Sequence, residues 1–273
     1  MKLRIATWNI NSVRLRVPLV KKFCQKFKPD ILCLQEIKCT DDQFPLSAIR
    51  KIGFEHVQVR GQKAYHGVAT LSRLPITRSD VLDFNGTDEA RHLAVKVDGT
   101  GDTPFILHNV YVPAGGDEPD AEKNPKFGQK LDYLQGMTRH FKNKRNKSKN
   151  RMMLVGDLNV APLETDVWSH KQLLKVVSHT PVEVDHFTKA QTAHNWIDAM
   201  RDHIPPEEKL YTWWSYRARD WRASNRGRRL DHVWVTPSLG NVVEKIQIID
   251  DARDWEKPSD HIPVIADIDL SIK

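Results

Sequence analysis

Short apolar runs bounded by turn residues recur from one end of the chain to the other, and they constrain its fold more than any other feature. Runs of this length that are rich in β-branched residues are typical of strands. We expect strands at 3–8, 31–35, 67–71, 92–97, 105–112, 152–155, 230–235 and 264–268. The alternation of apolar and polar residues in 92–97 predicts a half-buried strand, whereas the continuous apolar run in 152–155 predicts a strand buried on both faces.

Helical patterns fall between these predicted strands. Residues 15–26 and 130–142 predict helices, and 44–53 predicts a short helix with Pro45 near its first turn and Gly53 at its end. No repeat, low-complexity tract or Pro/Gly/Ser-rich linker divides the 273 residues, so we expect a single domain, 1–273. Strands that outnumber helices favour a mixed α/β protein with more than one sheet and with helices packed outside.

Composition excludes several classes of protein. With 40% hydrophobic and 28% charged residues, the chain is neither collagen-like nor wholly disordered. No run of eighteen apolar residues exists that would span a membrane. The N-terminal segment becomes polar at Asn9 and Asn11, too early for a signal peptide, so we expect a cytoplasmic protein. Three cysteines without a C-x-x-C pair exclude a disulfide framework, and Cys33 is expected to be a small buried side chain.

The net charge of +7 is concentrated in two stretches. Residues 142–151 carry six basic side chains and no acid, and 216–229 carry six arginines with Asp220 as the only acid. Outside these stretches the acids outnumber the bases, so the positive charge is local, as expected of a face that binds a polyanion. For 142–151, a solvated loop between a helix and a strand is the alternative interpretation.

Aromatic residues border or interleave the arginines of the second stretch: Trp213, Trp214, Tyr216 and Trp221. A guanidinium group binds phosphate through its planar fork, and aromatic rings stack on bases or insert between them. The segment therefore predicts contact with nucleic acid.

Polar residues follow several predicted strands directly, and most of them offer oxygen ligands: Asn9, Glu36, Asp157, Asn159, Asp231 and Asp260. Carboxylate and amide oxygens suit Mg²⁺ or Mn²⁺ better than zinc. Each residue alone is explained equally well by a helix cap or a turn. Their recurrence at five or six strand ends favours metal-assisted hydrolysis of a phosphodiester, with a carboxylate that deprotonates water. His261 follows Asp260 directly, so in an extended segment the two side chains point different ways.

At these residues the sequence resembles the exonuclease III family of DNA-repair enzymes, the class II abasic-site endonucleases. The resemblance is collinear over nearly the whole chain and rests on the motifs ATWNINSVR (6–14), LQEIK (34–38), GQK (61–63), YVPAG (111–115), GDLNVAP (156–162), YTWWSYR (211–217), NRGRRLDH (225–232) and EKPSDH (256–261). The G-D-x-N and S-D-H elements are shared with DNase I and inositol phosphatases, whereas the L-Q-E-x-K, Y-x-P and arginine-rich motifs are narrower.

The resemblance implies a four-layered α/β-sandwich of two central mixed β-sheets flanked by helices, with the site at one end of the sheets. It implies a metal site formed by Asn9, Glu36, Asp157, Asn159, Asp260 and His261. In the catalytic set, Asp157 would position or deprotonate the attacking water, and Asp231 would orient His261. Asn159 and His261 would bind the phosphate, and Tyr111 would contact the phosphate or assist the leaving oxygen.

The substrate implied by the resemblance is duplex DNA with an abasic site, cut on its 5′ side, together with hydrolysis from 3′ ends. Mg²⁺ would be the cofactor, Mn²⁺ could substitute, and the enzyme would be a monomer. DNA contacts would come from Asn11, Arg91, Trp213, Arg217, Arg226, Arg228 and Leu230. Some family members have a tryptophan at the position of Arg228 and insert a methionine at that of Arg217, so the balance of endonuclease and exonuclease activity stays open.

Two alternatives remain at this point. One is a phosphomonoesterase on the same scaffold, and the other is a catalytically silent DNA-binding protein. We also expect that replacing Arg226, Arg228 and Arg229 with alanine weakens DNA binding and flattens its salt dependence.

Overall fold

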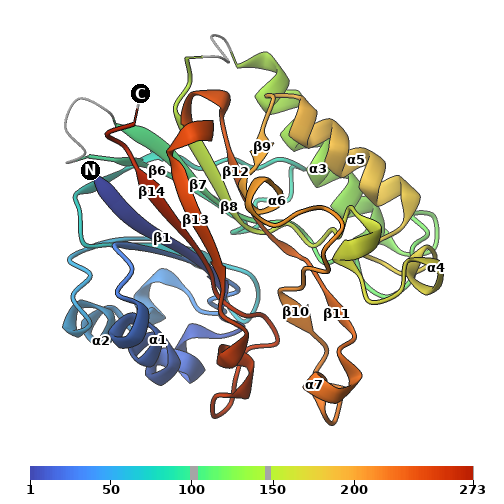
Figure 1. The fold of residues 1–273 in the computed structure, drawn as a ribbon, viewed down its shortest axis with the longest axis horizontal. Helices are drawn as coiled ribbons and strands as arrows, with labels where there is room; N and C mark the ends of the chain where they lie inside the picture. The colour runs from blue at the N-terminus through green and yellow to red at the C-terminus, as the bar shows by residue number, and fades with distance from the viewer. Residues whose placement is uncertain (99–103, 145–148, 273) are drawn as a thin grey trace.

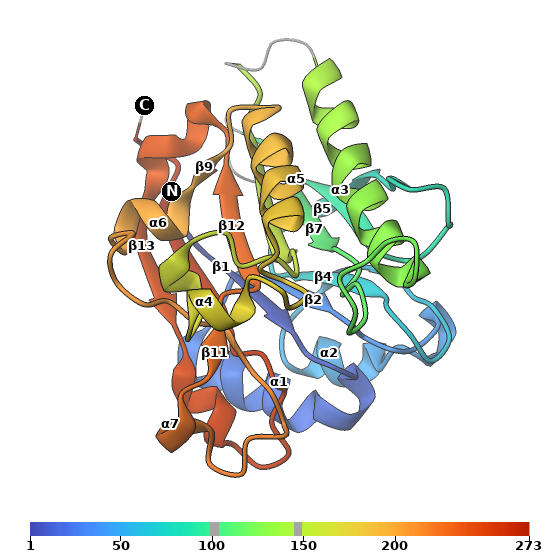
Figure 2. The same ribbon diagram turned by 90° about the vertical axis from the view of Figure 1, so that its right-hand side faces the viewer.

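Two β-sheets pack face to face, and helices cover both outer faces (Figures 1 and 2). The computed structural model describes residues 1–98, 104–144 and 149–272. Within these ranges the chain forms two six-stranded sheets and a separate two-stranded ribbon. Both large sheets are mixed, so the predicted four-layered sandwich is confirmed.

The strands of the first sheet are β1 (Lys2–Asn9), β2 (Ile31–Gln35), β3 (His56–Arg60), β4 (Val68–Ser72), β13 (Val243–Ile248) and β14 (Val264–Asp269). Those of the second sheet are β5 (Ile76–Asp80), β6 (His92–Val97), β7 (Phe105–Tyr111), β8 (Met152–Asp157), β9 (Ile197–Asp198) and β12 (Asp231–Val235). The ribbon consists of β10 (Trp213–Trp214) and β11 (Gly227–Arg228). The helices are α1 (Val13–Phe27), α2 (Leu46–Lys51), α3 (Pro125–Asn143), α4 (His170–Leu173), α5 (Pro181–Thr192), α6 (Ala199–His203) and α7 (Trp221–Ser224).

The strand orders bring one end of each central strand to the same side of the molecule. The first sheet runs β13-β14-β1-β2-β4-β3 and the second runs β5-β6-β7-β8-β12-β9. The parallel pair β1–β2 aligns Asn9 with Gln35, and the parallel pair β7–β8 aligns Tyr111 with Asp157. The antiparallel strand β12 begins at Asp231, opposite Asp157. Polar residues at these ends therefore meet at one edge of the sandwich.

Three apolar layers stabilise the sandwich. The interior between the sheets contains side chains of both, including Ile5, Cys33 and Val155. Helix α1 packs on the outer face of the first sheet, and α3 and α5 pack on the outer face of the second. Burial of these faces is the main favourable contribution to folding. Cys33 is buried and all three cysteines are free, as predicted.

Local sequence signals explain where several helices begin. Pro45 precedes α2 and Gly53 follows it with φ 102°, which confirms the short helix predicted there. In α3, the side chain of Asn124 accepts a hydrogen bond from the backbone N–H of Lys126. Helix α5 begins with a capping box between Thr180 and Glu183.

The half-buried strand predicted at 92–97 is wrong, because every residue of β6 except Lys96 is buried. Leu93 and Val95 face the core between the sheets, and the ring of His92 packs on Phe84 on the other side. Both faces are therefore covered. The run in β8 is buried throughout, as predicted.

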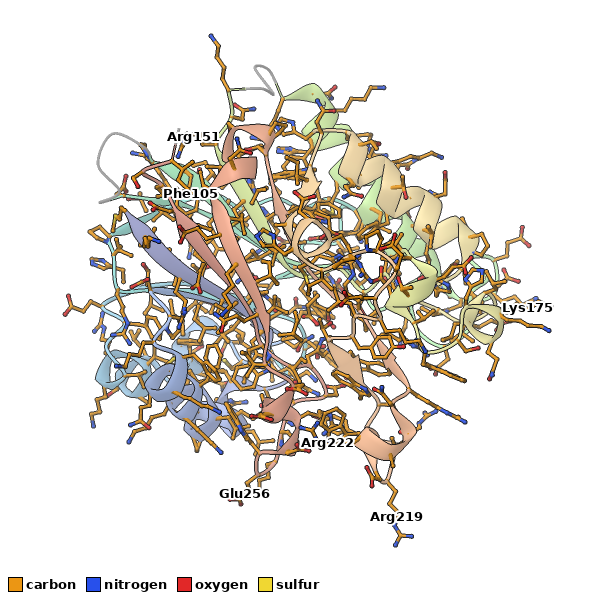
Figure 3. All side chains as sticks on the ribbon, in the orientation of Figure 1. Phe105, Arg151, Lys175, Arg219, Arg222 and Glu256 are labelled. Carbon is orange, nitrogen blue, oxygen red and sulfur yellow. The ribbon has the colours of Figure 1, made fainter. Side chains whose placement is uncertain are left out.

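The described residues of the two basic stretches lie at opposite ends of the molecule, so these residues do not form one face. In Figure 3, Arg151 lies near the end of α3, far from Arg219 and Arg222 around α7. The loop predicted within 142–151 falls partly on 145–148, which lie outside the described residues. No helix in the described ranges combines the length and apolarity needed to cross a membrane.

Candidate active site

Asn9 links the ends of the two sheets. Its side-chain Nδ2 donates hydrogen bonds to Glu36 Oε1 (2.9 Å) and to Asp157 Oδ2 (2.8 Å). Its Oδ1 accepts the backbone N–H of Asn11 at 3.1 Å. In this structure Asn9 thus bridges two carboxylates through its NH₂ group, and its proposed role as a metal ligand stays a prediction.

The turn after β8 places a second amide against Asp157. The backbone N–H and the Nδ2 of Asn159 donate to the two carboxylate oxygens of Asp157 at 3.0 and 3.1 Å. Asn159 has a φ of 54°, a left-handed conformation that is unusual for a residue with a side chain. Gly156 allows β8 to approach β7, because a Cβ there would lie 1.9 Å from the carbonyl oxygen of Val110.

His261 lies between two buried acids. Its Nδ1 donates to Asp231 Oδ2 at 2.8 Å, and its Nε2 lies 3.6 Å from Asp157 Oδ2. Burial alone would lower the pKa of His261, but the charges of Asp231 and Asp157 raise it to about 10. Burial also raises the pKa of Asp157 to about 7, against the opposing charge of His261. The cluster therefore keeps a proton between an imidazole and two carboxylates at neutral pH.

Glu36, the residue after β2, is held ionised. Burial would raise its pKa, but Lys38, at 2.8 Å, and the Asn9 hydrogen bond outweigh this and lower it. Burial, together with the nearby charges of Glu36 and Asp157, raises the pKa of Tyr111 well above its ordinary value, so the phenol keeps its proton. Glu36 also has a left-handed φ of 49°. Such strain occurs preferentially at functional sites.

Asp260 and His261 point in different directions, as predicted. The carboxylate of Asp260 accepts hydrogen bonds from Asn11 Nδ2 (2.9 Å) and Trp213 Nε1 (3.0 Å). Although burial would raise the pKa of Asp260, His261 and these two donors hold it below its ordinary value. The side chain of Asn11 thus donates a hydrogen bond to the acidic cluster, and its predicted DNA contact stays a prediction.

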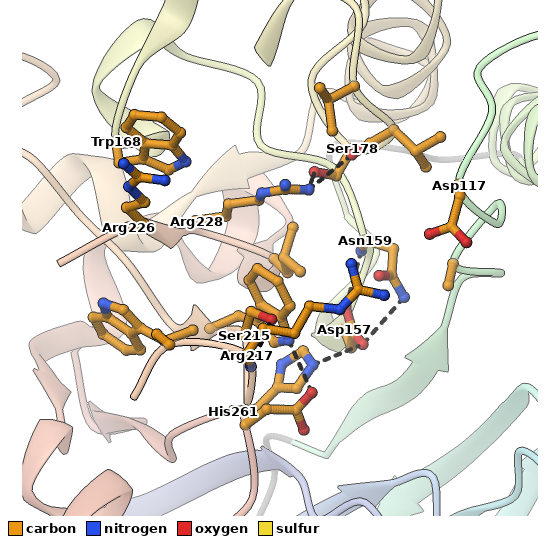
Figure 4. A pocket seen from close by; sticks show the side chains of 18 of the residues that line it. Asp117, Asp157, Asn159, Trp168, Ser178, Ser215, Arg217, Arg226, Arg228 and His261 are labelled. Atoms are coloured by element: carbon orange, nitrogen blue, oxygen red, sulfur yellow. Dashed lines mark hydrogen bonds and ion pairs between the residues drawn. The ribbon is translucent and has the colours of Figure 1, made fainter. Parts of the chain in front are cut away.

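Five of these residues line the floor of a cavity of about 860 Å³ (Figure 4): Glu36, Asp157, Asn159, Asp260 and His261. Arg228 lies in its wall, where Nη1 donates to the Val177 carbonyl (2.9 Å) and to Ser178 Oγ (2.8 Å). The Arg228 guanidinium also stacks 5.2 Å from the Trp213 ring, and that of Arg226 stacks 4.7 Å from Trp168. Arg217 and Leu230 complete the predicted DNA-contact residues that line this cavity.

Arg229 does not belong to the predicted DNA surface. Its side chain is 1% exposed and pairs with Asp166 (2.8 Å) and Asp198 (2.6 Å). Arg222 is exposed, but it pairs with Asp254 and stacks on Trp221. Only part of the arginine stretch is therefore free to meet phosphates.

Tyr111 and Arg91 line a neighbouring cavity of about 500 Å³, rather than the first one. The Arg91 guanidinium lies 4.9 Å from the Tyr111 ring, pairs with Glu89 and is nearly buried. Its proposed contact with DNA stays a prediction.

Sequence reasoning missed five residues that shape the site: Lys38, Lys130, Trp168, Ser178 and Glu183. Lys38 lies in the LQEIK motif, so its spacing from Glu36 was a usable signal. The other four come from distant helices and loops, and their position depends on tertiary packing.

Comparison with known protein families matches residues 6–261 to the Endonuclease/Exonuclease/phosphatase family. The chain belongs to this family. Its structure aligns with that of an AP endonuclease from Archaeoglobus fulgidus with a TM-score of 0.89 and 31% identity, over 98% of this chain and 100% of the other.

Two further proteins are similar to this chain over nearly their whole length. The 3′ phosphatase NExo from Neisseria, bound to a product DNA hairpin, has a TM-score of 0.86 and 29% identity, over 98% of this chain and 100% of that one. Exodeoxyribonuclease III from Haemophilus influenzae is 29% identical over 276 residues, which cover 97% of this chain and 99% of the relative. The predicted exonuclease III relationship is confirmed, and the chain is a DNA-repair nuclease of the phosphodiester-hydrolase class.

Proposed function

We propose that this nuclease uses Mg²⁺ to cut duplex DNA on the 5′ side of abasic sites and also hydrolyses phosphodiesters from 3′ ends. The observation that carries the proposal is the His261–Asp157 pair at the floor of a cavity whose walls hold Trp213 and arginines, with Asp231 buried behind His261. An acid–base group thus lies where an extruded sugar and its phosphate would enter.

The donor set fits a hard divalent cation. Carboxylates of Glu36, Asp157 and Asp260 line one cavity, and the low pKa of Glu36 and Asp260 keeps both negative. Oxygen donors of this kind match Mg²⁺, and Mn²⁺ accepts the same ligands. When bound, the cation would neutralise the scissile phosphate and favour attack by water.

The protein's own groups would move the protons. Asn9 and Asn159 hold the Asp157 carboxylate, which would take a proton from the attacking water. As the water oxygen bonds to phosphorus and the bond to the 3′ oxygen breaks, the His261 imidazolium would stabilise the added negative charge. Tyr111, which keeps its phenolic proton, would donate to the leaving oxygen or to the phosphate.

The cavity wall would select the substrate. Trp213 and Leu230 would pack against an abasic sugar, which is extruded more easily than a paired base. Arg217 and Arg226, both exposed at the cavity, would contact phosphates. Phosphomonoesterase activity remains the alternative function, because Arg228 brings a guanidinium into the wall that could bind a terminal phosphate.

We further propose that the chain acts as one domain and as a cytoplasmic monomer, as its sequence suggests. Duplex DNA with abasic sites or 3′ ends would be its partner.

Variants of the floor residues test the site. We expect Glu36→Ala, Asp157→Asn and His261→Ala each to lower the cleavage rate by about 10²–10⁴-fold. Each variant removes a group that would hold the cation, accept a proton or stabilise negative charge. The rate is measured on a labelled abasic duplex, with Lys189→Ala as the control because Lys189 is exposed and pairs with Asp185 on α5. Unchanged activity in all three variants would show that these residues are not the catalytic site.

A further inference from the structure

A buried ion pair lies directly behind the active-site cavity. Lys130 of α3 and Glu183 of α5 are both 0% exposed, and their charged groups are in hydrogen-bond contact. A buried pair of charges contributes little to stability compared with an apolar pair of similar volume, since both charges lose their hydration. A contribution to stability therefore does not explain why this ion pair is present.

The Lys130 ammonium contacts two loops that line the cavity. Its Nζ donates to the carbonyl oxygen of Asn159 at 2.7 Å and to that of Ala114 at 3.3 Å. The first bond fixes the backbone of Asn159 in its left-handed conformation, from which the side chain reaches Asp157 and the Val112 carbonyl. The ammonium thus holds the turn that presents Asn159 to the site.

Glu183 connects the ion pair to the loop that anchors Arg228 in the cavity wall. Its carboxylate accepts the backbone N–H of Ser178 at 2.9 Å and the hydroxyl of Thr180 at 2.6 Å. Ser178 in turn accepts Nη1 of Arg228, the guanidinium in the cavity wall. One ion pair therefore joins the Asn159 turn to the loop that anchors Arg228.

The surroundings leave the lysine stem little freedom. A Cβ at Gly115, whose φ is 90°, would lie 2.9 Å from Cδ of Lys130 and 3.1 Å from Val177. The stem is wedged beneath the loop that contains Ala114, so a loss of the ammonium would not be repaired by a small shift of the side chain.

We propose that Lys130 and Glu183 are positioning residues of the active site. Their buried ion pair fixes the Asn159 turn and the loop that anchors Arg228 relative to each other. Neither side chain touches the substrate. The inference rests on the proposed function, because it assigns to Asn159 a part in phosphate cleavage.

Single-turnover and steady-state cleavage of the abasic duplex test this role. We expect Lys130→Met to lower kcat about 10–100-fold with KM changed by less than about threefold, because a misplaced turn affects the transition state more than binding. Lys130→Arg, which restores a cation, should recover part of kcat. The control is Arg4→Met, which removes the Arg4–Asp267 ion pair at the other end of β1. It should lower the melting temperature but leave kcat unchanged.

A double-mutant cycle with Asn159→Ala separates positioning from general stability. If Lys130 acts through Asn159, Lys130→Met has little further effect on kcat in the Asn159→Ala background. Additive losses, or a normal kcat in Lys130→Met while Asn159→Ala is slow, would overturn the inference and leave the proposed function standing. Normal cleavage by Asn159→Ala would overturn both.

A charge-neutral variant covers the case in which Lys130→Met does not fold. Lys130→Met/Glu183→Gln leaves no unpaired buried charge, so it should fold, as shown by a cooperative thermal transition. We expect its kcat to be reduced at least 10-fold. A wild-type kcat in this folded variant would contradict the positioning role.

Discussion

At the scale of single residues, burial and neighbouring charge decide which groups carry a proton. Asp157 is buried beside Asp231, and its pKa rises to about 7, whereas His261 between the same acids has its pKa raised to about 10. An acid that is easily protonated and an imidazole that stays charged suit the binding and cleavage of an anion. The sequence motifs contain these residue types, but only the packing shows that the imidazole of His261 lies between both carboxylates.

Two exposed arginines of the same segment should differ in their contribution to DNA binding. Arg226 stacks on Trp168 at the cavity, whereas Arg222 is neutralised by Asp254 and nearby acids. We expect Arg226→Ala to weaken duplex binding and to reduce the slope of log K against log salt by about 0.9. Arg222→Ala is the matched control, and titrations by fluorescence anisotropy over a range of salt concentrations measure both. Equal slopes in the two variants would contradict this division.

The expectation that Arg229 contributes to DNA binding is wrong; we expect this residue to stabilise the fold instead. Because its guanidinium is buried between Asp166 and Asp198, Arg229→Met leaves two acids short of a partner. Breaking a buried pair costs about 3–5 kcal/mol of folding free energy. Urea unfolding of this variant checks the loss, and wild-type stability would show that the pair is dispensable.

At the scale of elements, the eight strands predicted from sequence are the inner strands of the two sheets. The four edge strands β3, β5, β9 and β13 were not predicted. Edge strands carry polar and charged residues that discourage pairing with other chains, so they lack the apolar runs of central strands. Residues 76–80, with the sequence ITRSD, illustrate this. Helix α5 was missed as well, although the spacing of Thr180 and Glu183 is a capping-box signal.

The packing of α3 on β6 and β7 makes folding stability dependent on pH. His92 and His108 are completely buried, with Nε2 and Nδ1 3.0 Å apart. Burial lowers the pKa of His108 to about 3 and that of His92 well below 6.5. The unfolded chain takes up protons near pH 6.5, but the folded chain does not. Stability present above pH 6.5 is therefore lost as the pH falls toward 3, by up to about 1.4 kcal/mol per pH unit for each imidazole.

Urea unfolding between pH 7 and pH 5 measures this dependence. His108→Gln keeps a hydrogen-bonding group but does not titrate, so its free energy of unfolding should fall less steeply than that of the wild type, by up to about 1.4 kcal/mol per pH unit. The same slope in wild type and variant would show that His108 is not the group responsible.

At the scale of the whole molecule, the functional side chains lie together at one end of the sandwich. Strand ends from both sheets supply Asn9, Glu36, Asp157 and Asp231, and this convergence follows from which strands run parallel. The sequence predicted the two mixed sheets and the polar strand ends, because central strands and motifs leave local signals. It did not predict which cations stay free for DNA, since ion pairs such as Arg229–Asp166 join residues far apart in the chain.

The most direct test of the proposed cleavage uses a labelled duplex with one synthetic abasic site, incubated with Mg²⁺, with Mn²⁺ or with EDTA. We expect a single nick on the 5′ side of that site with either cation and none with EDTA. A ladder that shortens from the 3′ end without this nick would contradict the endonuclease assignment. No cleavage with either metal would contradict the nuclease mechanism and favour the phosphomonoesterase alternative.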